Sequence, residues 1–266
     1  MATRIIRRRV ALLVACLVAR SAVAAAAGDS LNFVSCPIVR DTASVPCWLA
    51  EYEGELYFLT IQSDVSAPVT PPWLGHRVLV EGVLSAEPRI CGGVVLKPVH
   101  LSVLPEQDAS CNVMLPAESK YNLTFEPPRP PGPSAGRLAF DAASAAPPSP
   151  APTTGPRDFV ISYDFDGLVG FSHARVLTEI LDYARAVNAG EIVITGYRGA
   201  VRLSNGQTMM EDEAIGKRRA EQLAMLLRGA NLTSPSYSVR SQDDTARATG
   251  INDYLTRRVV VTVRPR

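Results

Sequence analysis

The chain has 266 residues, enough for one large or two modest domains, and its 27 Lys and Arg nearly balance its 26 Asp and Glu. Five of the basic residues fall in the first 27 positions, which contain no acid, so the remainder carries 22 basic against 26 acidic residues. This balance argues against an extended basic surface, and we therefore expect no nucleic acid partner.

The N-terminus, residues 1–27, has the pattern of a secretory signal peptide. The arginine-rich segment TRIIRRR is followed by the apolar run VALLVACLVA and by the small residues of SAVAAAAG. This run is too short for a membrane-spanning helix, which needs about 18 apolar residues, and no later stretch approaches that length. We predict an exported, periplasmic chain without a membrane span. In a second interpretation LVAC is a lipoprotein signal, and a lipid on Cys16 anchors the protein.

Residues 28–125 predict an all-β domain, either a small barrel or a sandwich. The segments GELYFLTIQ, HRVLVEGVLS and GGVVLKPVHLSVL are rich in β-branched and aromatic residues, and glycines and prolines separate them. Helical periodicity is absent from this part of the sequence. The region therefore predicts strands joined by turns.

Four cysteines lie in this first domain: Cys36, Cys47, Cys91 and Cys111. An even number in an exported chain favours two disulfides, for which three pairings exist. We expect neighbour pairing, Cys36 with Cys47 and Cys91 with Cys111. The rival interpretation, a zinc site, has less support because no two cysteines have C-x-x-C spacing and the histidines lie apart. We therefore expect neither a metal nor a cofactor.

A proline-rich linker, residues 126–156, separates this domain from a second one at residues 157–266. Its sequence, EPPRPPGPSAGRLAFDAASAAPPSPAPTTGP, favours an extended, semi-rigid spacer. In the second domain FVISYDFD, EIVITGY, SYSVRS and RRVVVTVRP predict strands, while SHARVLTEILDYARAV and the segment from Glu211 to RGAN predict helices. The order β-α-β-α-β-β predicts an α+β domain with two helices on one face of a mixed sheet.

Two adjacent arginines on the second predicted helix, Arg218 and Arg219, are not equivalent. The apolar stripe of this helix contains Leu223 and Leu227; Arg218 points away from the stripe, whereas Arg219 lies on its margin. Arg218 is therefore expected on the solvated surface. A partly covered guanidinium needs an anion or a carbonyl as partner, so the partner of Arg219 is either internal or a ligand.

Four short segments of the second domain occur in the order found in a known family. They are YDFD on the first strand, ITGY at the end of the second, IGKRRA on the second helix and TRRVVVTV at the last strand. With these segments, residues 157–266 resemble the OmpA-like domain of outer-membrane protein A, peptidoglycan-associated lipoproteins and flagellar motor stator proteins. The resemblance implies an envelope location, periplasmic or associated with the outer membrane, and non-catalytic binding of peptidoglycan through the meso-diaminopimelate of its stem peptide.

The resemblance also implies roles for individual residues. Arg219 corresponds to the family's arginine, which implies that it clamps a ligand carboxylate with two hydrogen bonds. Tyr197 and Arg198 are expected to form the wall of the pocket. Arg257 and Asp166 are expected to support it.

Two positions depart from the family pattern. Gly199 stands where the family has the aspartate that pairs with the ligand's ammonium group, and Thr256 stands where it has an asparagine. The loop before the second helix is also longer than in the peptidoglycan-associated lipoproteins. One of Glu211, Asp212 and Glu213 is a candidate for the missing charge. In the alternative interpretation these acids only stabilise the positive end of the helix dipole.

Three hypotheses about function follow. In the first, the protein binds peptidoglycan through its OmpA-like domain, and other envelope proteins are candidate partners of the N-terminal domain. In the second, the domain is a structural or protein–protein interaction module that has lost this ligand, and Arg219 is tied to a carboxylate such as Asp166 or Glu213 with no open pocket beside it. The third, a wall hydrolase, has little support, because the sequence has no G-x-S-x-G, H-E-x-x-H or phosphate-loop motif and its three histidines are scattered.

Overall fold

The computed structural model describes residues 26–43, 45–62, 69, 71–120, 155–168, 173–232 and 234–266. The expected signal peptide up to residue 25, with Cys16, and most of the linker at 126–156 lie outside these residues. Among the described helices, none combines the length and the apolar character needed to cross a membrane. We call residues 26–120 the N-terminal part and residues 155–266 the C-terminal part.

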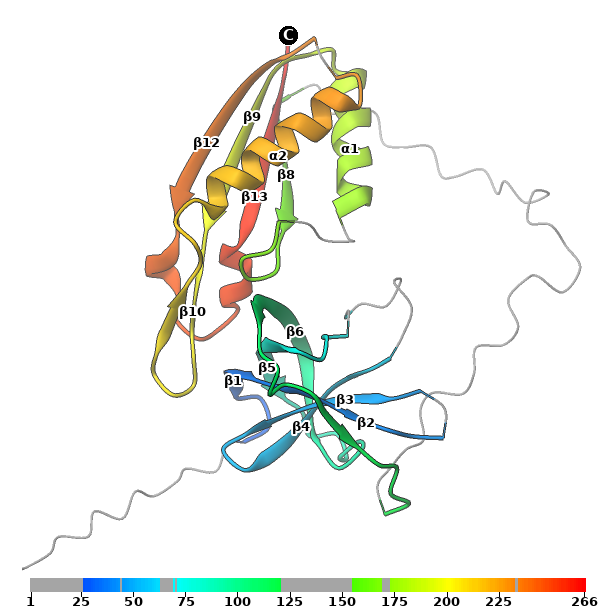
Figure 1. The fold of residues 1–266 in the computed structure, drawn as a ribbon. Coiled ribbons are helices and arrows are strands. Elements are labelled where there is room, and N and C mark those ends of the chain that lie inside the picture. Colours follow the sequence, from blue (N-terminus) through cyan, green and yellow to red (C-terminus); the bar gives the residue numbers. More distant parts are fainter. Residues whose placement is uncertain are drawn as a thin grey trace, which may run out of the picture.

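The N-terminal part is one seven-stranded sheet (Figure 1). Its strands run in the order β1-β5-β6-β4-β3-β2-β7. Their bounds are β1 Ser30–Ser35, β2 Pro37–Arg40, β3 Cys47–Tyr52, β4 Glu55–Ile61, β5 His76–Leu84, β6 Val94–Gln107 and β7 Val113–Leu115. The sheet curls, because β1 and β2 are distant in this order and yet only Cys36 separates them in the chain. The expected strands are present, but the described pairings form an open sheet and not a closed barrel.

Alternate residues of these strands share one apolar core, as the period of two along a strand requires. Phe33 on β1 and Val78 and Val80 on β5 are at most 1% exposed. The Phe33 ring stacks on that of Tyr52, with centroids 4.8 Å apart. This packing fixes the face of β1 that points inward and leaves Asn32 on the opposite face.

The two disulfides join Cys36 to Cys111 and Cys47 to Cys91, so the expected neighbour pairing is wrong. The pairing follows the neighbours in the sheet and not the spacing in the sequence. Cys36 precedes β2, and Cys111 precedes β7, which pairs in parallel with β2. Cys47 opens β3, which pairs with β4, and Cys91 lies in the turn before the start of β6, which also pairs with β4.

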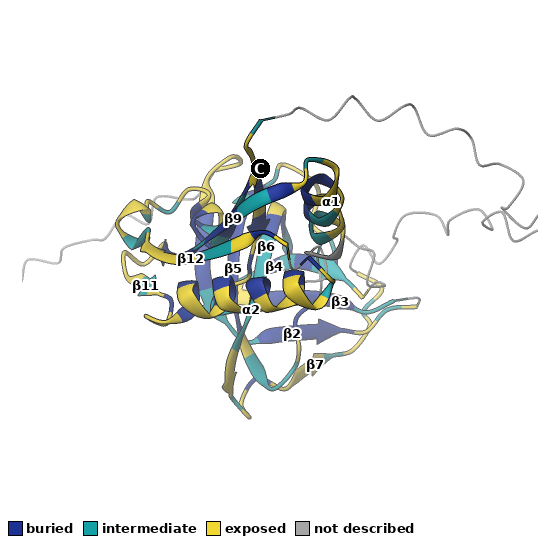
Figure 2. Ribbon diagram, turned by 90° about the horizontal axis from the view of Figure 1, so that it is seen from above, coloured by how far each residue is buried: buried dark blue, intermediate teal, exposed yellow. Residues whose placement is uncertain are grey.

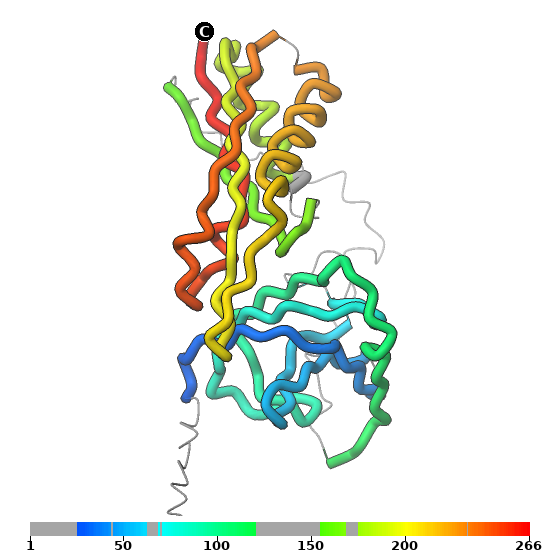
Figure 3. The backbone as a smooth tube through the Cα atoms, turned by 60° about the vertical axis from the view of Figure 1, so that its left-hand side comes forward, coloured from blue at the N-terminus to red at the C-terminus, as the bar shows by residue number. Residues whose placement is uncertain are grey.

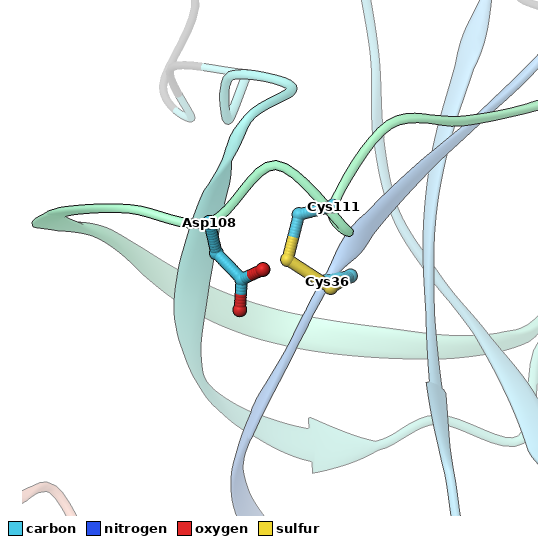
Figure 4. Close-up of side chains that lie close together, drawn as sticks. All are labelled: Cys36, Asp108 and Cys111. Carbon is cyan, nitrogen blue, oxygen red and sulfur yellow. A yellow bond between two sulfur atoms is a disulfide. The ribbon is translucent and has the colours of Figure 1, made fainter.

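One group of potential metal ligands in the described residues consists of Cys36, Cys111 and Asp108 (Figure 4). The two sulfur atoms are bonded to each other, so neither is available as a thiolate. The Asp108 carboxylate instead accepts hydrogen bonds from Arg77 and Ser110.

The C-terminal part is a four-stranded sheet in the order β12-β9-β13-β8, with both α-helices on one face (Figure 1). Strand β12 is parallel to β9, and β13 is antiparallel to β9 and β8. The bounds are β8 Arg157–Ser162, α1 His173–Ala186, β9 Ala189–Arg198, β10 Ala200–Arg202, β11 Thr208–Met210, α2 Ile215–Gly229, β12 Ser236–Asp243 and β13 Arg258–Pro265, with short 3-10 helices η1 at Thr245–Arg247 and η2 at Asp253–Thr256. The predicted order β-α-β-α-β-β is confirmed, with an added hairpin β10–β11.

Helix α2 has the two faces that its sequence predicts (Figure 2). Leu223, Leu227 and Arg219 lie on the buried face of the helix, whereas the side chain of Arg218 is 49% exposed. The helix begins at Ile215 and not near Glu211, so the three acids at 211–213 precede its first turn. The interpretation that they lie in the first turn of the helix is therefore wrong.

Helix α2 approaches β9 closely at Gly196 and Gly216. A Cβ on Gly196 would lie 2.7 Å from the carbonyl carbon of Gly216, and one on Gly216 would lie 2.9 Å from the oxygen of Gly196. Residues without a side chain permit this approach. It holds Arg219, one turn further along α2, against the end of β9.

The segment expected to be a long polar loop contains the hairpin β10–β11, which lies beside β1 of the N-terminal part (Figure 3). Asn32 on β1 makes the central contacts. Its backbone exchanges hydrogen bonds with Ser204, donating to the hydroxyl at 3.0 Å and accepting from the N–H at 2.8 Å. Its Nδ2 donates to the carbonyl oxygens of Arg202 at 3.1 Å and Gly250 at 2.9 Å.

An apolar cluster continues the contact between the two parts. Leu79 of the N-terminal part packs with Phe165, Val201 and Leu203 of the C-terminal part, and all four are at most 7% exposed. The backbone N–H of Phe165 also donates to the Ser102 hydroxyl at 2.9 Å. The sequence did not predict this direct contact between the two parts.

Candidate functional site

Arg219 is fully buried, and its guanidinium has a partner for each of its five N–H donors. Nε donates to the carbonyl oxygen of Gly167 at 2.8 Å. Nη1 donates to the carbonyl oxygen of Tyr197 at 3.3 Å and to Glu211 Oε2 at 3.0 Å. Nη2 donates to the carbonyl oxygen of Asp164 at 2.9 Å and to Glu211 Oε1 at 2.6 Å.

The Glu211 carboxylate is held from both sides. Besides the two-pronged contact with Arg219, its Oε1 accepts the backbone N–H of Asp166 at 2.9 Å and its Oε2 accepts that of Gly199 at 2.7 Å. Glu211 is 1% exposed. A carboxylate bound by a guanidinium fork and two amides is a strongly held anion. The arginine clamp expected for a ligand carboxylate therefore holds an internal one.

Tyr163 closes the other side of the clamp. Its ring centroid lies 4.8 Å from the guanidinium carbon of Arg219, within the range of a cation–π contact. Burial raises the pKa of Tyr163 to about 12, although the charge of Arg219 acts in the opposite direction. The phenol thus stays neutral at physiological pH.

Gly199 has no room for a side chain. A Cβ there would lie 2.7 Å from Arg257 Cγ and closer still to the hydroxyl of Thr256. The space that a side chain at position 199 would need is therefore occupied by Thr256 and Arg257.

Arg257 faces the N-terminal part, where its guanidinium binds the Glu81 carboxylate in a buried ion pair. Nη1 donates to Glu81 Oε1 at 3.2 Å, and Nη2 donates to Oε2. Arg257 and Glu81 are 1% and 4% exposed. Burial raises the pKa of Glu81, with the charge of Arg257 as the main opposing influence. The predicted supporting role of Arg257 stays a prediction, and in this structure the residue joins the two parts.

Tyr197 and Arg198, the expected pocket wall, lie at the end of β9 next to Glu211. Arg198 Nε donates to the carbonyl oxygen of Glu211 at 2.7 Å, and its Nη1 donates to Asp243 at 3.2 Å. The Tyr197 ring is covered by the guanidinium of Arg258, whose carbon lies 4.1 Å from the ring centroid. Both side chains thus contact protein groups at this end of the sheet.

Asp166 and Asp212 hold the segment that carries Glu211. Asp166 Oδ1 accepts the backbone N–H of Asp212 at 2.8 Å, and Asp212 Oδ1 accepts a hydrogen bond from Arg218 at 2.9 Å. Burial raises the pKa of Asp166. The structure therefore gathers five of the six predicted site residues around Glu211, and Arg257 contacts Glu81 instead.

The partners of the two buried arginines differ from the expectations. Arg219 pairs with Glu211 and not with Asp166 or Glu213, and nothing in the sequence distinguishes Glu211 from the acids that follow it. Arg257 pairs with Glu81, for which the sequence analysis has no expectation. The sequence signal for Glu81 is that it is the one charged residue in the segment VLVEGVL at 78–84, and a buried acid requires a partner.

Comparison with solved structures finds similarity to OmpA-like proteins. The OmpA-like domain of FopA1 from Francisella tularensis subsp. tularensis SCHU S4 is 14% identical over 41% of this chain and 73% of that one, with a TM-score of 0.34. The cell wall anchor of the T6SS from Pseudomonas aeruginosa is 20% identical over 42% and 83%, with a TM-score of 0.31. A putative MotB like protein from Desulfovibrio vulgaris is 16% identical over 42% and 77%, with a TM-score of 0.33.

No protein-family model matches the chain, and no curated protein matches it significantly.

Proposed function

We propose that this is a non-catalytic protein of the bacterial cell envelope whose OmpA-like part serves as a structural and protein–protein interaction module and does not bind peptidoglycan through Arg219. The observation that carries the proposal is the engagement of all five N–H donors of Arg219 by protein acceptors. A guanidinium with no free donor cannot clamp a second carboxylate without releasing the first.

The envelope location rests on independent features of the chain. Two disulfides are typical of proteins that fold in an oxidising compartment outside the cytoplasm. The N-terminal segment has a signal-peptide pattern. The periplasm satisfies both features, and the resemblance to OmpA-like domains points to the same compartment.

The absence of catalysis is part of the proposal and is supported by the positions of the histidines. The imidazole of His76 contacts the carbonyl oxygen of Leu104 at 2.9 Å, and that of His100 stacks on the Tyr254 ring. Both imidazoles thus contact groups of the protein, and in this proposal neither is the general base of a hydrolase.

The competing proposal is peptidoglycan binding at Arg219, which the resemblance favours. It requires Glu211 to leave the clamp and a ligand carboxylate to replace it. Removing one partner of a buried ion pair costs about 3–5 kcal/mol. A ligand would have to compensate this cost before it gained any net affinity.

Co-sedimentation with purified peptidoglycan distinguishes the two proposals. The informative variant is Arg219→Met combined with Glu211→Leu, because replacing both members of a buried pair by apolar residues leaves no unpaired charge. We expect the wild type and this double variant to co-sediment to the same extent, with circular dichroism confirming that both are folded. Arg218→Ala is the matched control, since this arginine is adjacent and exposed. Loss of sedimentation in the double variant alone would establish the competing proposal.

A further inference from the structure

A cleft of about 580 Å³ lies where the hairpin β10–β11 meets the curled sheet. Its walls come from both parts of the chain, with Phe33 and Leu104 on one side and Leu203 and Met209 on the other. Its volume falls in the range of ligand sites, roughly 300–1,000 Å³. Neither Arg219 nor Glu211 lines it, so it is separate from the closed clamp.

Part of the cleft surface is apolar and aromatic. This surface comes from the partly exposed side chains of Tyr52, Leu104 and Met209, whereas Phe33 is 1% exposed and supports the Tyr52 ring from within the core. The half-buried Tyr52 ring stacks on Phe33 at an interplanar angle of 20°, which extends this surface toward the opening. A flat apolar surface favours a ligand with an apolar face.

The rim of the cleft carries side-chain amides from both parts. Gln107 ends β6, and Asn205 and Gln207 lie in the turn of the hairpin; all three are exposed. Asn205 Nδ2 donates to Gln207 Oε1 at 3.3 Å, which orients these two amides toward each other. An amide both donates and accepts hydrogen bonds, as a hydroxyl group does. The rim therefore matches a ligand with many hydroxyl groups.

The charges of the cleft disfavour an anionic ligand. Arg77 Nε donates to Asp108 Oδ2 at 2.8 Å, which neutralises the single cation of the lining, and Glu106 adds a further negative charge. Hydrogen bonds from Ser110 and Arg77 lower the pKa of Asp108 to about 2, so its carboxylate stays ionised. A phosphate-bearing ligand or a nucleic acid would meet net negative charge here.

We propose that this cleft binds a short, uncharged oligosaccharide. The apolar face of a pyranose ring packs on the partly exposed ring of Tyr52, and its hydroxyl groups exchange hydrogen bonds with the amides of Gln107 and Gln207. Because both parts of the chain contribute, the site is complete when the hairpin is docked through Asn32. A saccharide that contacts both walls would also stabilise the docked arrangement.

Calorimetric titration of the full mature chain tests this site. The probes are tetrasaccharides of N-acetylglucosamine, β-linked glucose, α-linked glucose and mannose, with tetra-alanine as the peptide control. We expect saturable binding of at least one tetrasaccharide and none of tetra-alanine. The combined variant Gln107→Ala and Gln207→Ala should weaken that binding by about tenfold, because two hydrogen bonds are lost.

The control variant is Gln242→Ala, which removes an exposed amide on β12 away from the cleft and should leave binding unchanged. Three results would overturn the proposal: no tetrasaccharide binds, binding is equal in the wild type and the combined variant, or tetra-alanine binds instead. The probes contain no stem peptide, so this outcome is independent of whether Arg219 binds peptidoglycan.

Discussion

Arg219 with Glu211 and Arg257 with Glu81 are both buried arginine–glutamate pairs, in which no side chain is more than 4% exposed. The first joins residues 8 positions apart within the C-terminal part, and every donor of its arginine has a partner. The second joins residues 176 positions apart, and Arg257 Nε has no hydrogen-bond partner among the described residues. The first pair is therefore a local lock within the C-terminal part, whereas the second depends on docking between the two parts.

The largest expected effect is the loss of stability when the Arg219–Glu211 pair is broken. Glu211→Ala leaves the Arg219 charge buried without its anion, so we expect the free energy of unfolding to fall by about 3–5 kcal/mol. Denaturant titration followed by circular dichroism measures it. Arg218→Ala, which breaks the same kind of charge pair at an exposed site, the contact with Asp212, should cost about 1 kcal/mol or less. Equal losses in the two variants would mean that the Glu211 pair is not a lock.

The second effect concerns docking. Glu81→Ala should lower the free energy needed to separate the two parts by about 2–3 kcal/mol. This loss is smaller than the one expected for Glu211→Ala, because Arg257 can regain water when the parts separate. Hydrogen exchange measures this opening separately from global unfolding. We expect faster exchange in β1 and the hairpin β10–β11, with little change in α2. Uniformly faster exchange across the whole chain would show that the contact is not a separate unit.

The third effect is a loss of stability when Gly199 is replaced by alanine, and it tests whether this position requires a glycine. Gly199→Ala places a methyl group against Thr256 and Arg257, and overpacking of this kind costs about 1–3 kcal/mol. Gly229→Ala is the matched control, because a Cβ there meets nothing within 4 Å and alanine is the better helix former. Thermal unfolding of the two variants should move in opposite directions. A neutral Gly199→Ala would show that the site tolerates a side chain.

The smallest effect is the pH dependence of the contact between the two parts. Burial, and then the charge of Arg257, lower the pKa of His100 from its ordinary value of 6.5. The unfolded chain therefore takes up a proton more readily than the folded one, so stability from this group is lost as pH falls below about 6.5. The raised pKa of Glu81 has the opposite sign, since the folded state takes up that proton more readily.

Comparison of the wild type with His100→Phe isolates the histidine contribution, because phenylalanine keeps a ring on Tyr254 and Glu81 is present in both proteins. The wild type should lose stability relative to the variant between pH 7 and pH 5, as measured by denaturant titration at several pH values. Parallel pH profiles would contradict the assignment.

The helices and strands of the C-terminal part could be predicted from local periodicity, because their formation depends on residues that are close together in the sequence. The stripe through Leu223 and Leu227 placed Arg219 on its margin and Arg218 away from it. The structure confirms that Arg218 is exposed, and it buries Arg219 completely. The helix spacing could not identify the partner of Arg219, because the fold of the preceding segment decides which of three adjacent acids points inward.

Contacts between distant segments could not be predicted from the sequence. The disulfide partner of Cys36 depends on the parallel pairing of β2 with β7. The docking of Asn32 on the hairpin joins segments about 170 positions apart. Both follow from tertiary arrangement and leave no periodic signal in the chain.

The central claim is that Glu211 occupies the clamp formed by Arg219, and nitrogen-15 NMR of the arginine side chains tests it most directly. The account predicts that the guanidinium of Arg219 gives slowly exchanging N–H signals in the free protein, and that these signals do not change when a soluble stem peptide containing meso-diaminopimelate is added. A saturable shift of the Arg219 signals on adding the peptide would contradict the account and show that the clamp accepts an external carboxylate.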